Sequence, residues 1–304
     1  MEHSLSHIFE SLLNIKGLKV QRGVPLANHT TWKVGGPVEL LVRANGVSSL
    51  DGLLEIAGAE GIPLFVLGNG SNILVSDAGL KGIALRLGGE LTSIEIKGEV
   101  LTACGGAPLG SLVENALKVS LKGVEFAFGI PGTVGGAVMT NAGAFSGSIA
   151  EVVDEVQTMN MDGEMMRHRD MSGEYRSPLV PRNEIVTRAS FRLTQGSGEQ
   201  IRKEMDSVRA KRKATQPWGM ATAGSVFKNP AGDSAGRMIE ECGLKGKSIG
   251  KARVSDTHAN FIINDGGALA SDIKELIDLM RREVRARFGL NLEQEITLVG
   301  FDEE

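Results

Sequence analysis

Short apolar runs separated by glycine-containing turns predict a β-rich N-terminal part of the chain. The segment 38–43 (VELLVR) is typical of a strand, and leucines at helical spacing predict a helix over 49–60 that ends at Gly61. Asp162-Gly163 lies between two strand-like segments and therefore predicts a β-hairpin. Further strands are expected at 62–67, 73–75, 83–87, 92–96, 99–103, 151–160, 164–169 and 184–193, with a helix over 109–117.

Beyond the polar segment 195–198 the pattern changes to the 3.6-residue period of helices. The helix predicted over 272–288 carries a stripe of large apolar side chains on one face. Asp272 and Glu275 resemble a capping box at its start. A strand over 295–299 is expected near the end of the chain. The helices are expected at 199–213, 234–242 and 272–288. The pattern therefore predicts an α+β N-terminal part, a linker and a C-terminal βα module.

Glycine is the unusual feature of the composition, because it accounts for 40 of the 304 residues, well above the usual share of roughly 7%. The glycines have no triplet period, which excludes collagen, and the apolar patterns between them argue against disorder. Seventeen of them lie between Gly68 and Gly147. Because glycine lets a backbone approach a ligand closely, this stretch is the first candidate for a binding site.

Charge and cysteine content favour a cytoplasmic protein that acts on small molecules. Lys and Arg total 33 and Asp and Glu total 37, and the resulting net charge of −4 argues against a nucleic-acid-binding protein. Two cysteines without metal or redox spacing support neither a disulfide framework nor a zinc site. No signal peptide or membrane-spanning apolar run is visible. His3 and His7 have metal-ligand spacing but lack a third partner, so no metal site is predicted.

Two loops of small residues are candidates for a nucleotide site, although neither matches a standard motif. The segment 246–248 (GKS) ends like a P-loop but lacks the glycine five residues earlier. The segment 68–72 (GNGSN) lacks the third glycine of a dinucleotide-binding fold and continues into a strand, which disfavours that fold. The alternative for both glycine-containing loops, 68–72 and 129–143, is that they are plain turns that bind no ligand. Two such loops nevertheless suit a long, flat cofactor that contains phosphate groups.

Seven short motifs follow one another along nearly the whole chain, from about residue 28 to residue 300. They are HTTWKVGG at 29–36, GNGSN at 68–72, GIPGTVGG at 129–136, YRS at 175–177, GSVFKNP at 224–230, HANF at 258–261 and LEQE at 292–295. In this order they resemble the UDP-N-acetylenolpyruvoylglucosamine reductase family, which acts in bacterial peptidoglycan precursor synthesis. Tyr175 is the single tyrosine, so the additional tyrosine-bearing substrate loop has no candidate, and the chain resembles the type II members.

The resemblance implies an FAD-dependent reductase that binds FAD non-covalently and uses NADPH to reduce a UDP-sugar. The sequence does not give the oligomeric state, and a monomer is favoured. It also implies an α+β FAD-binding fold of the vanillyl-alcohol-oxidase type, followed by a C-terminal α/β substrate-binding domain at 196–289. The two FAD-binding subdomains are expected at 1–67 plus 290–304 and at 68–195. The residues expected at FAD are Thr31, Gly68, Asn69, Gly70, Ser71, Asn72, Pro131, Gly132, Thr133, Gly135, Gly136, Asn141, Ala142 and Gly143.

The resemblance assigns the chemistry to Arg176, Ser225 and Glu295. Arg176 would stabilise the negative charge that develops beside the substrate carboxylate, and a surface loop arginine is the alternative. Ser225 matches the family's proton donor, and a turn serine is the alternative. Glu295 matches the family's active-site glutamate, but Glu293 lies on the same face if both belong to the last strand. A buried acid at this place would have a raised pKa and could hydrogen-bond in its neutral form.

Four more residues are expected at the substrate: Tyr175, Lys228, Asn229 and His258. A hydrogen-bonded structural histidine is the alternative for His258. The basic run 209–213 either ends a helix in solvent or contacts the phosphates of the UDP-sugar or NADPH. Two other functions stay open at this point. One is an oxidase of the same fold group that acts on sugars or aldonolactones, and the other is a nucleotide-binding module without catalysis.

Overall fold

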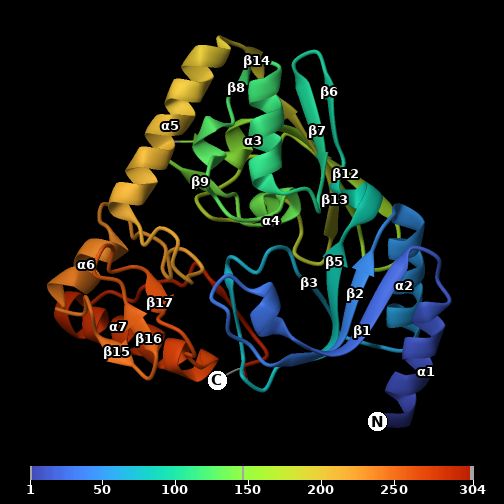
Figure 1. The fold of residues 1–304 in the computed structure, drawn as a ribbon, viewed down its shortest axis with the longest axis horizontal. Helices are drawn as coiled ribbons and strands as arrows, with labels where there is room; N and C mark the ends of the chain where they lie inside the picture. The colour runs from blue at the N-terminus through green and yellow to red at the C-terminus, as the bar shows by residue number, and fades with distance from the viewer. Residues whose placement is uncertain (1, 146, 302–304) are drawn as a thin grey trace. The chain divides into compact units, whose positions relative to one another are not determined.

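The computed structural model describes residues 2–145 and 147–301 and divides into two units. Unit 1 consists of Met1–Arg22, Leu40–Gly68 and Gly82–Ala210, and unit 2 of Gly23–Glu39, Asn69–Lys81 and Lys211–Glu304. Both units contain helices and strands, as predicted for an α+β protein (Figure 1). The three predicted domain boundaries stay predictions, because a division into two units does not resolve them.

An antiparallel five-stranded sheet is the centre of the C-terminal part of unit 1 (Figure 1). Its strand order is β12 (Met165–Arg169), β11 (Val153–Met159), β13 (Ile185–Arg192), β7 (Val100–Cys104) and β6 (Ile94–Lys97). The predicted hairpin at Asp162-Gly163 is confirmed, since β11 and β12 pair from Met159 opposite Met165 onward. The helices α3 (Leu109–Lys118) and α4 (Val134–Met139) contribute to the same buried apolar cluster as the sheet.

A second sheet has the order β1 (Leu18–Pro25), β2 (Pro37–Ala44), β5 (Leu80–Leu87) and β3 (Leu64–Val66). Within unit 1, α1 (Glu2–Leu13) and α2 (Val47–Ala59) bury leucines in one cluster with the strand residues. Leu50 and Leu53 of α2 have no exposed surface, as their helical spacing predicts. Fully burying each such side chain stabilises the fold by about 1.5–3 kcal/mol.

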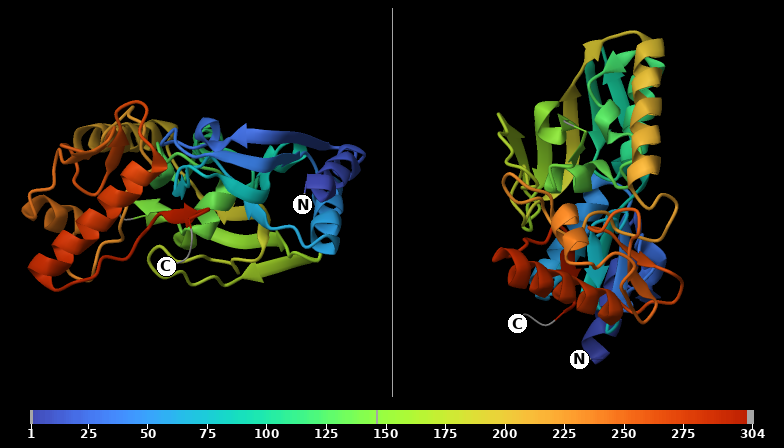
Figure 2. Two further views of the ribbon diagram at one scale, coloured as in Figure 1. Left: turned by 90° about the horizontal axis from the view of Figure 1, so that it is seen from below. Right: turned by 90° about the vertical axis from the view of Figure 1, so that its left-hand side faces the viewer.

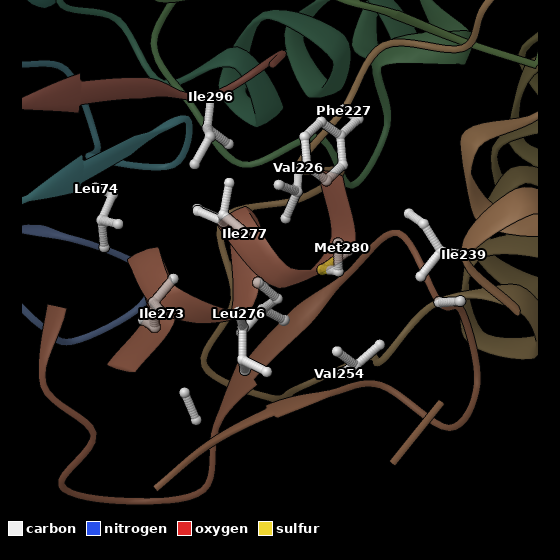
Figure 3. Packing of buried hydrophobic residues seen from close by; sticks show 14 of the residues in the cluster. Leu74, Val226, Phe227, Ile239, Val254, Ile273, Leu276, Ile277, Met280 and Ile296 are labelled. Carbon is white, nitrogen blue, oxygen red and sulfur yellow. The ribbon is translucent and has the colours of Figure 1, made fainter. Parts of the chain in front are cut away.

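Unit 2 is built around α7 (Ala270–Phe288), whose apolar stripe packs on a small sheet of β15 (Ser248–Ile249), β16 (Ala252–Val254) and β17 (Ile262–Asn264). Figure 3 shows Ile273, Leu276, Ile277 and Met280 of α7 among the buried side chains of this cluster. The helix α6 (Ala235–Glu241) joins the same core. Figure 2 shows α7 from two further directions. The apolar stripe predicted for the helix over 272–288, which is α7, is therefore confirmed as a core face.

The start of α7 differs from the prediction at Asp272 and Glu275. The helix begins after Leu269, and Asp272 accepts the Leu269 backbone N–H at 3.0 Å from the third helical position. Asp77 supplies the other cap, because its carboxylate accepts the backbone N–H groups of Ala270 at 2.8 Å and Ser271 at 2.9 Å. A residue almost 200 positions earlier therefore completes the cap, which no local pattern could indicate.

Short elements complete the described chain, and the long helix α5 (Gly198–Thr215) follows the five-stranded sheet. None of the helices within 2–145 and 147–301 is long and apolar enough to cross a membrane. The short strands are β4 (Ile73–Val75), β8 (Leu121–Lys122), β9 (Gly143–Ala144), β10 (Gly147–Ser148), β14 (Thr194–Gln195) and β18 (Thr297–Val299). The short helical turns are η1 (Leu26–His29), η2 (Gly89–Thr92), η3 (Glu125–Ala127) and η4 (Ile149–Glu151).

Candidate functional site

In unit 2, the predicted cofactor loop 69–72 is held against the motif at 29–36. The carbonyl oxygen of Gly70 accepts the backbone N–H of Thr31 at 3.1 Å and its hydroxyl at 3.3 Å. Gly70 has a φ of +61°, and a Cβ at this position would come within 2.2 Å of the His29 carbonyl oxygen. Glycine is therefore required here by both conformation and space.

The same loop also joins the last motif of the chain. Asn72 donates its side-chain N–H to the Glu295 carbonyl oxygen at 3.1 Å, and β4 pairs in parallel with β18 directly after these residues. The backbone N–H of Glu295 donates to Val226 at 2.8 Å, and Val226 follows Ser225. Within unit 2 the fold thus brings together Asn72, Ser225 and Glu295 from three distant segments.

The predicted strand at 295–299 is too long, and this separates the two candidate glutamates. The strand begins at Thr297, because Glu295 lies in a bend and Gln294 forms an isolated bridge with Phe227. The shared face expected for Glu293 and Glu295 is therefore wrong. Glu293 has an exposed side chain that pairs with the Lys228 ammonium at 2.6 Å. Glu295 is partly buried.

Of the remaining substrate candidates in unit 2, Asn229 is exposed and His258 is embedded in the fold. The side-chain oxygen of Asn229 accepts the Ala235 backbone N–H at 3.1 Å. His258 accepts the Asn260 backbone N–H on Nδ1 at 3.2 Å, and its ring centroid lies 4.9 Å from that of Phe261. Burial is the main cause that lowers the pKa of the His258 imidazole. These contacts suit a neutral structural histidine.

In unit 1, Thr133 organises the second glycine-rich loop. Its hydroxyl accepts the Gly136 backbone N–H at 3.2 Å at the start of α4. A Cβ at Gly68 would approach that hydroxyl to 2.9 Å. The backbone N–H of Gly135 donates to the Gly105 carbonyl at 2.8 Å. Glycine thus lets separate backbone segments of this unit pack closely.

Arg176 and Tyr175 lie in an irregular segment of unit 1 between β12 and β13. The Arg176 guanidinium donates to the carbonyl oxygens of Gly143 at 2.7 Å and Asn141 at 3.3 Å. Arg176 also has a left-handed φ of +56°, which is uncommon for a residue other than glycine. The neighbouring Tyr175 ring is 54% exposed. The fold therefore joins the predicted arginine to the predicted cofactor segment 141–143.

The basic run 209–213 is not uniformly solvated. Arg209, in unit 1, lies over the Phe128 ring with its guanidinium carbon 4.9 Å from the centroid. Arg212, in unit 2, is 7% exposed and donates to the Gln216 side chain at 3.3 Å. The expectation of a plain solvent-exposed helix end is therefore wrong for Arg212, because the helical period places it on the buried face of α5.

Each glycine loop combines small residues with hydroxyl and amide side chains, a composition that suits the phosphates of a flavin dinucleotide. Gly68 and Gly70 have no space for a Cβ, and hydroxyl and amide side chains lie beside them. This combination is the chemistry that backbone binding of a pyrophosphate requires. The described residues contain no group of three or more His, Cys, Asp or Glu side chains that could hold a metal ion, and the side chain of His3 lies outside the description.

Comparisons with known proteins give consistent results over the whole chain. Residues 38–169 match a model of an FAD binding domain, and residues 216–299 match the C-terminal domain of UDP-N-acetylenolpyruvoylglucosamine reductase. The reductase of that name from Halalkalibacterium halodurans is 39% identical over 299 residues, which are 97% of this chain and 99% of that protein. The one from Bacillus subtilis is 37% identical over 286 residues, with coverages of 93% and 94%.

Solved structures agree with these relatives. The structure of UDP-N-acetylenolpyruvylglucosamine reductase from Thermus caldophilus matches with a TM-score of 0.81 at 38% identity, covering 93% of this chain and 99% of that chain. A glucooligosaccharide oxidase from Acremonium strictum shares the fold alone, with a TM-score of 0.51 at 12% identity over 95% of this chain and 59% of that chain. The predicted FAD-binding fold of the vanillyl-alcohol-oxidase type is confirmed.

Proposed function

The chain belongs to the UDP-N-acetylenolpyruvoylglucosamine reductase family of FAD-dependent oxidoreductases, and we propose that it reduces UDP-N-acetylglucosamine enolpyruvate to UDP-N-acetylmuramate with NADPH as electron donor. The observation that carries this proposal is the near full-length similarity to reductases of that name, at 39% identity over 97% of the chain. The FAD binding model over residues 38–169 agrees with the cofactor. The product is a precursor of bacterial peptidoglycan.

The residues proposed to hold FAD come from the glycine-rich motifs of the sequence. Thr31 and 69–72 of unit 2, and Gly68 with the 131–143 region of unit 1, would hold FAD without a covalent bond. When bound, FAD would supply the hydride chemistry, with NADPH as the source of electrons, its N5 as the hydride donor and C3 of the enolpyruvyl group as the acceptor. The chain's own residues then have to stabilise negative charge at C2 and its carboxylate and to supply a proton to C2.

Arg176 is proposed to stabilise the developing charge. Its guanidinium presents N–H donors in a plane that matches a carboxylate. Its contacts with the Gly143 and Asn141 carbonyls hold that plane in one orientation. A preorganised donor of this kind is worth more than a mobile one, because it needs no reorganisation during the reaction.

Ser225 is proposed to deliver the proton to C2, and Glu295 to support that transfer. A serine hydroxyl is a weak acid, so it needs a neighbouring group that assists it. The bond from the Glu295 backbone N–H to the Val226 carbonyl, at 2.8 Å, keeps the segments of Glu295 and Ser225 adjacent. Lys228 and Asn229, which lie two and three residues after Val226, are proposed to contact the uridine nucleotide, and Tyr175 of unit 1 is proposed as a further substrate contact.

The test separates the two half-reactions. Glu295→Gln should leave flavin reduction by NADPH intact, but it should slow reoxidation of the reduced flavin by the enolpyruvyl substrate by about 10²-fold or more. Glu283→Gln is the matched control, because Glu283 belongs to the same unit and its contact with Arg282 at 3.6 Å is a surface ion pair. Full turnover by Glu295→Gln, or equal losses in both variants, would contradict the assignment.

A flavin absorbance spectrum distinguishes this function from its alternatives. A nucleotide-binding module without catalysis would bind a UDP-sugar with no flavin bound. A sugar or aldonolactone oxidase would carry flavin but would not oxidise NADPH in response to the enolpyruvyl substrate. Release of yellow FAD on acid denaturation would support non-covalent attachment, and a yellow protein pellet would oppose it. We further propose a monomer that acts in the cytoplasm, which gel filtration and cell fractionation test.

A further inference from the structure

The segment that carries Tyr175 and Arg176 is docked tightly on the residues that follow α4 in unit 1. The backbone N–H of Leu179 donates to the Val138 carbonyl at 3.3 Å. A Cβ at Gly173 would come within 2.4 Å of Leu179 and 2.8 Å of the Asn141 side-chain nitrogen. The segment therefore fits against the end of α4 without space for adjustment at this place.

Asn141 makes the polar contacts that hold this docked segment. It is 4% exposed and has a left-handed φ of +41°. Its side-chain N–H donates to the Glu174 carbonyl at 3.1 Å, and its side-chain oxygen accepts the Ala150 backbone N–H at 3.0 Å. The Glu174 carbonyl also accepts the Ser177 backbone N–H at 3.2 Å, which closes the turn around Arg176.

Asn141 is thus connected to Arg176 in two ways. Its side chain fixes the turn two residues before the arginine, and its own carbonyl oxygen accepts from the arginine guanidinium at 3.3 Å. Asn141 therefore contributes both to the turn that holds the left-handed backbone of Arg176 and, together with the Gly143 carbonyl, to the orientation of its guanidinium. Strained conformations of this kind persist where the surrounding structure fixes them, and they cluster at functional sites.

We propose that Asn141 is a positioning residue that sets the orientation of the Arg176 guanidinium toward the substrate carboxylate. This inference rests on the proposed function and deepens it, because it gives Asn141 a role distinct from the cofactor contact expected from its sequence motif. The side-chain amide of Asn141 hydrogen-bonds to the Glu174 carbonyl and to the Ala150 backbone N–H. Its proposed effect on the substrate is therefore exerted through Arg176.

The first experiment replaces Asn141 in the FAD-loaded full-length enzyme. Asn141→Gly removes both side-chain bonds, and glycine tolerates the φ of +41°. Because small misplacements of a positioning group are costly, reoxidation of the reduced flavin by the enolpyruvyl substrate should slow by about 10- to 100-fold. Flavin reduction by NADPH should be little changed. Equal slowing of both half-reactions, or none, would overturn the proposal.

The matched control is Asn160→Gly in the turn between β11 and β12 of the same unit. The Asn160 side chain also holds a turn through backbone contacts. Its oxygen accepts the backbone N–H groups of Asp162 at 3.1 Å and Glu164 at 2.8 Å. Asn160 lies in a different turn from Arg176, so both half-reactions should match the wild type. If Asn160→Gly slowed the substrate half-reaction as much as Asn141→Gly does, the cause would be a general loss of stability of unit 1. That result would overturn the proposal.

A double-mutant cycle provides a readout that a merely structural role would not change. In an Arg176→Lys background, Asn141→Gly should weaken substrate binding much less than in the wild-type background, because the guanidinium it positions is gone. Binding is followed by the flavin spectrum, which works even when turnover is slow. The same fold loss in both backgrounds would overturn the proposal.

A folding defect is separated from the proposed effect by Asn141→Asp. This variant keeps an oxygen for the Ala150 N–H but loses the donor to the Glu174 carbonyl. Retained flavin with a slowed substrate half-reaction supports the proposal, whereas loss of flavin from both Asn141 variants overturns it. A wild-type enzyme that binds flavin but does not reduce the enolpyruvyl substrate would instead refute the proposed function.

Discussion

Replacing Gly70 by alanine tests whether the cofactor loop of unit 2 depends on a glycine. Gly70 is buried with a φ of +61°, and an added Cβ would lie 2.2 Å from the His29 carbonyl oxygen and 2.7 Å from the Thr30 Cα. Both neighbours are backbone atoms, so neither can move like the end of a side chain. The loop must therefore shift, and with it the Gly70 carbonyl that accepts both bonds from Thr31.

The expected cost has two parts. A left-handed backbone costs a residue other than glycine about 1–2 kcal/mol, and overpacking a close contact costs about 1–3 kcal/mol. The sum predicts that Gly70→Ala lowers the free energy of unfolding by about 2–5 kcal/mol. Gly243→Ala is the matched control in the same unit, because Gly243 has a φ of +71° with nothing within 4 Å of an added Cβ. It should lose the conformational part alone.

The assay is urea unfolding followed by tryptophan fluorescence. Both tryptophans, Trp32 and Trp218, belong to unit 2, and Trp32 is fully buried, so the signal reports on the unit that holds Gly70 and Gly243. FAD affinity is measured in parallel by flavin fluorescence, and it should fall for Gly70→Ala alone. Equal stabilities and equal FAD affinities for the two variants would refute the steric argument.

Two further predictions concern unit 2. Asp77→Ala removes the acceptor of the Ala270 and Ser271 backbone N–H groups and should destabilise the protein by about 1–2 kcal/mol in urea unfolding; an unchanged midpoint would contradict the capping role. Because burial lowers the pKa of His258 below its unfolded value, its neutral ring contributes stability above about pH 6.5 that is lost as the pH falls through the folded pKa. The wild type should therefore lose more stability than His258→Asn when the pH is lowered from neutrality, and parallel pH profiles would oppose this.

Much of the fold could be predicted because its elements bury one face in a regular period. The stripe on α7 and the alternation around Asp162-Gly163 are local patterns, and the structure confirms both. The helix α1 and the strand β1 lie outside the predicted elements. No strand is predicted over Leu18–Pro25, because its apolar positions alternate only weakly with polar ones. The predicted strand at 295–299 is too long, because Glu295 and Ile296 lie in a bend that follows the bridge between Phe227 and Gln294.

The candidate site could be predicted only as a set of motifs. Sequence order cannot indicate that Asn72 donates to Glu295, because 223 residues separate them. It also could not separate Glu293 from Glu295 by physical argument, whereas the exposed pair with Lys228 does. The role of Asn141 in holding the turn of Arg176 is a tertiary feature that no spacing rule contains.

The most direct test of the central claim is to reduce the flavin of the purified protein with NADPH under anaerobic conditions and then add UDP-N-acetylglucosamine enolpyruvate. The account predicts a flavin spectrum that bleaches with NADPH and returns on addition of the substrate, with UDP-N-acetylmuramate as the product. A protein that shows no flavin spectrum after FAD addition, or a reduced flavin that the substrate does not reoxidise, would contradict it.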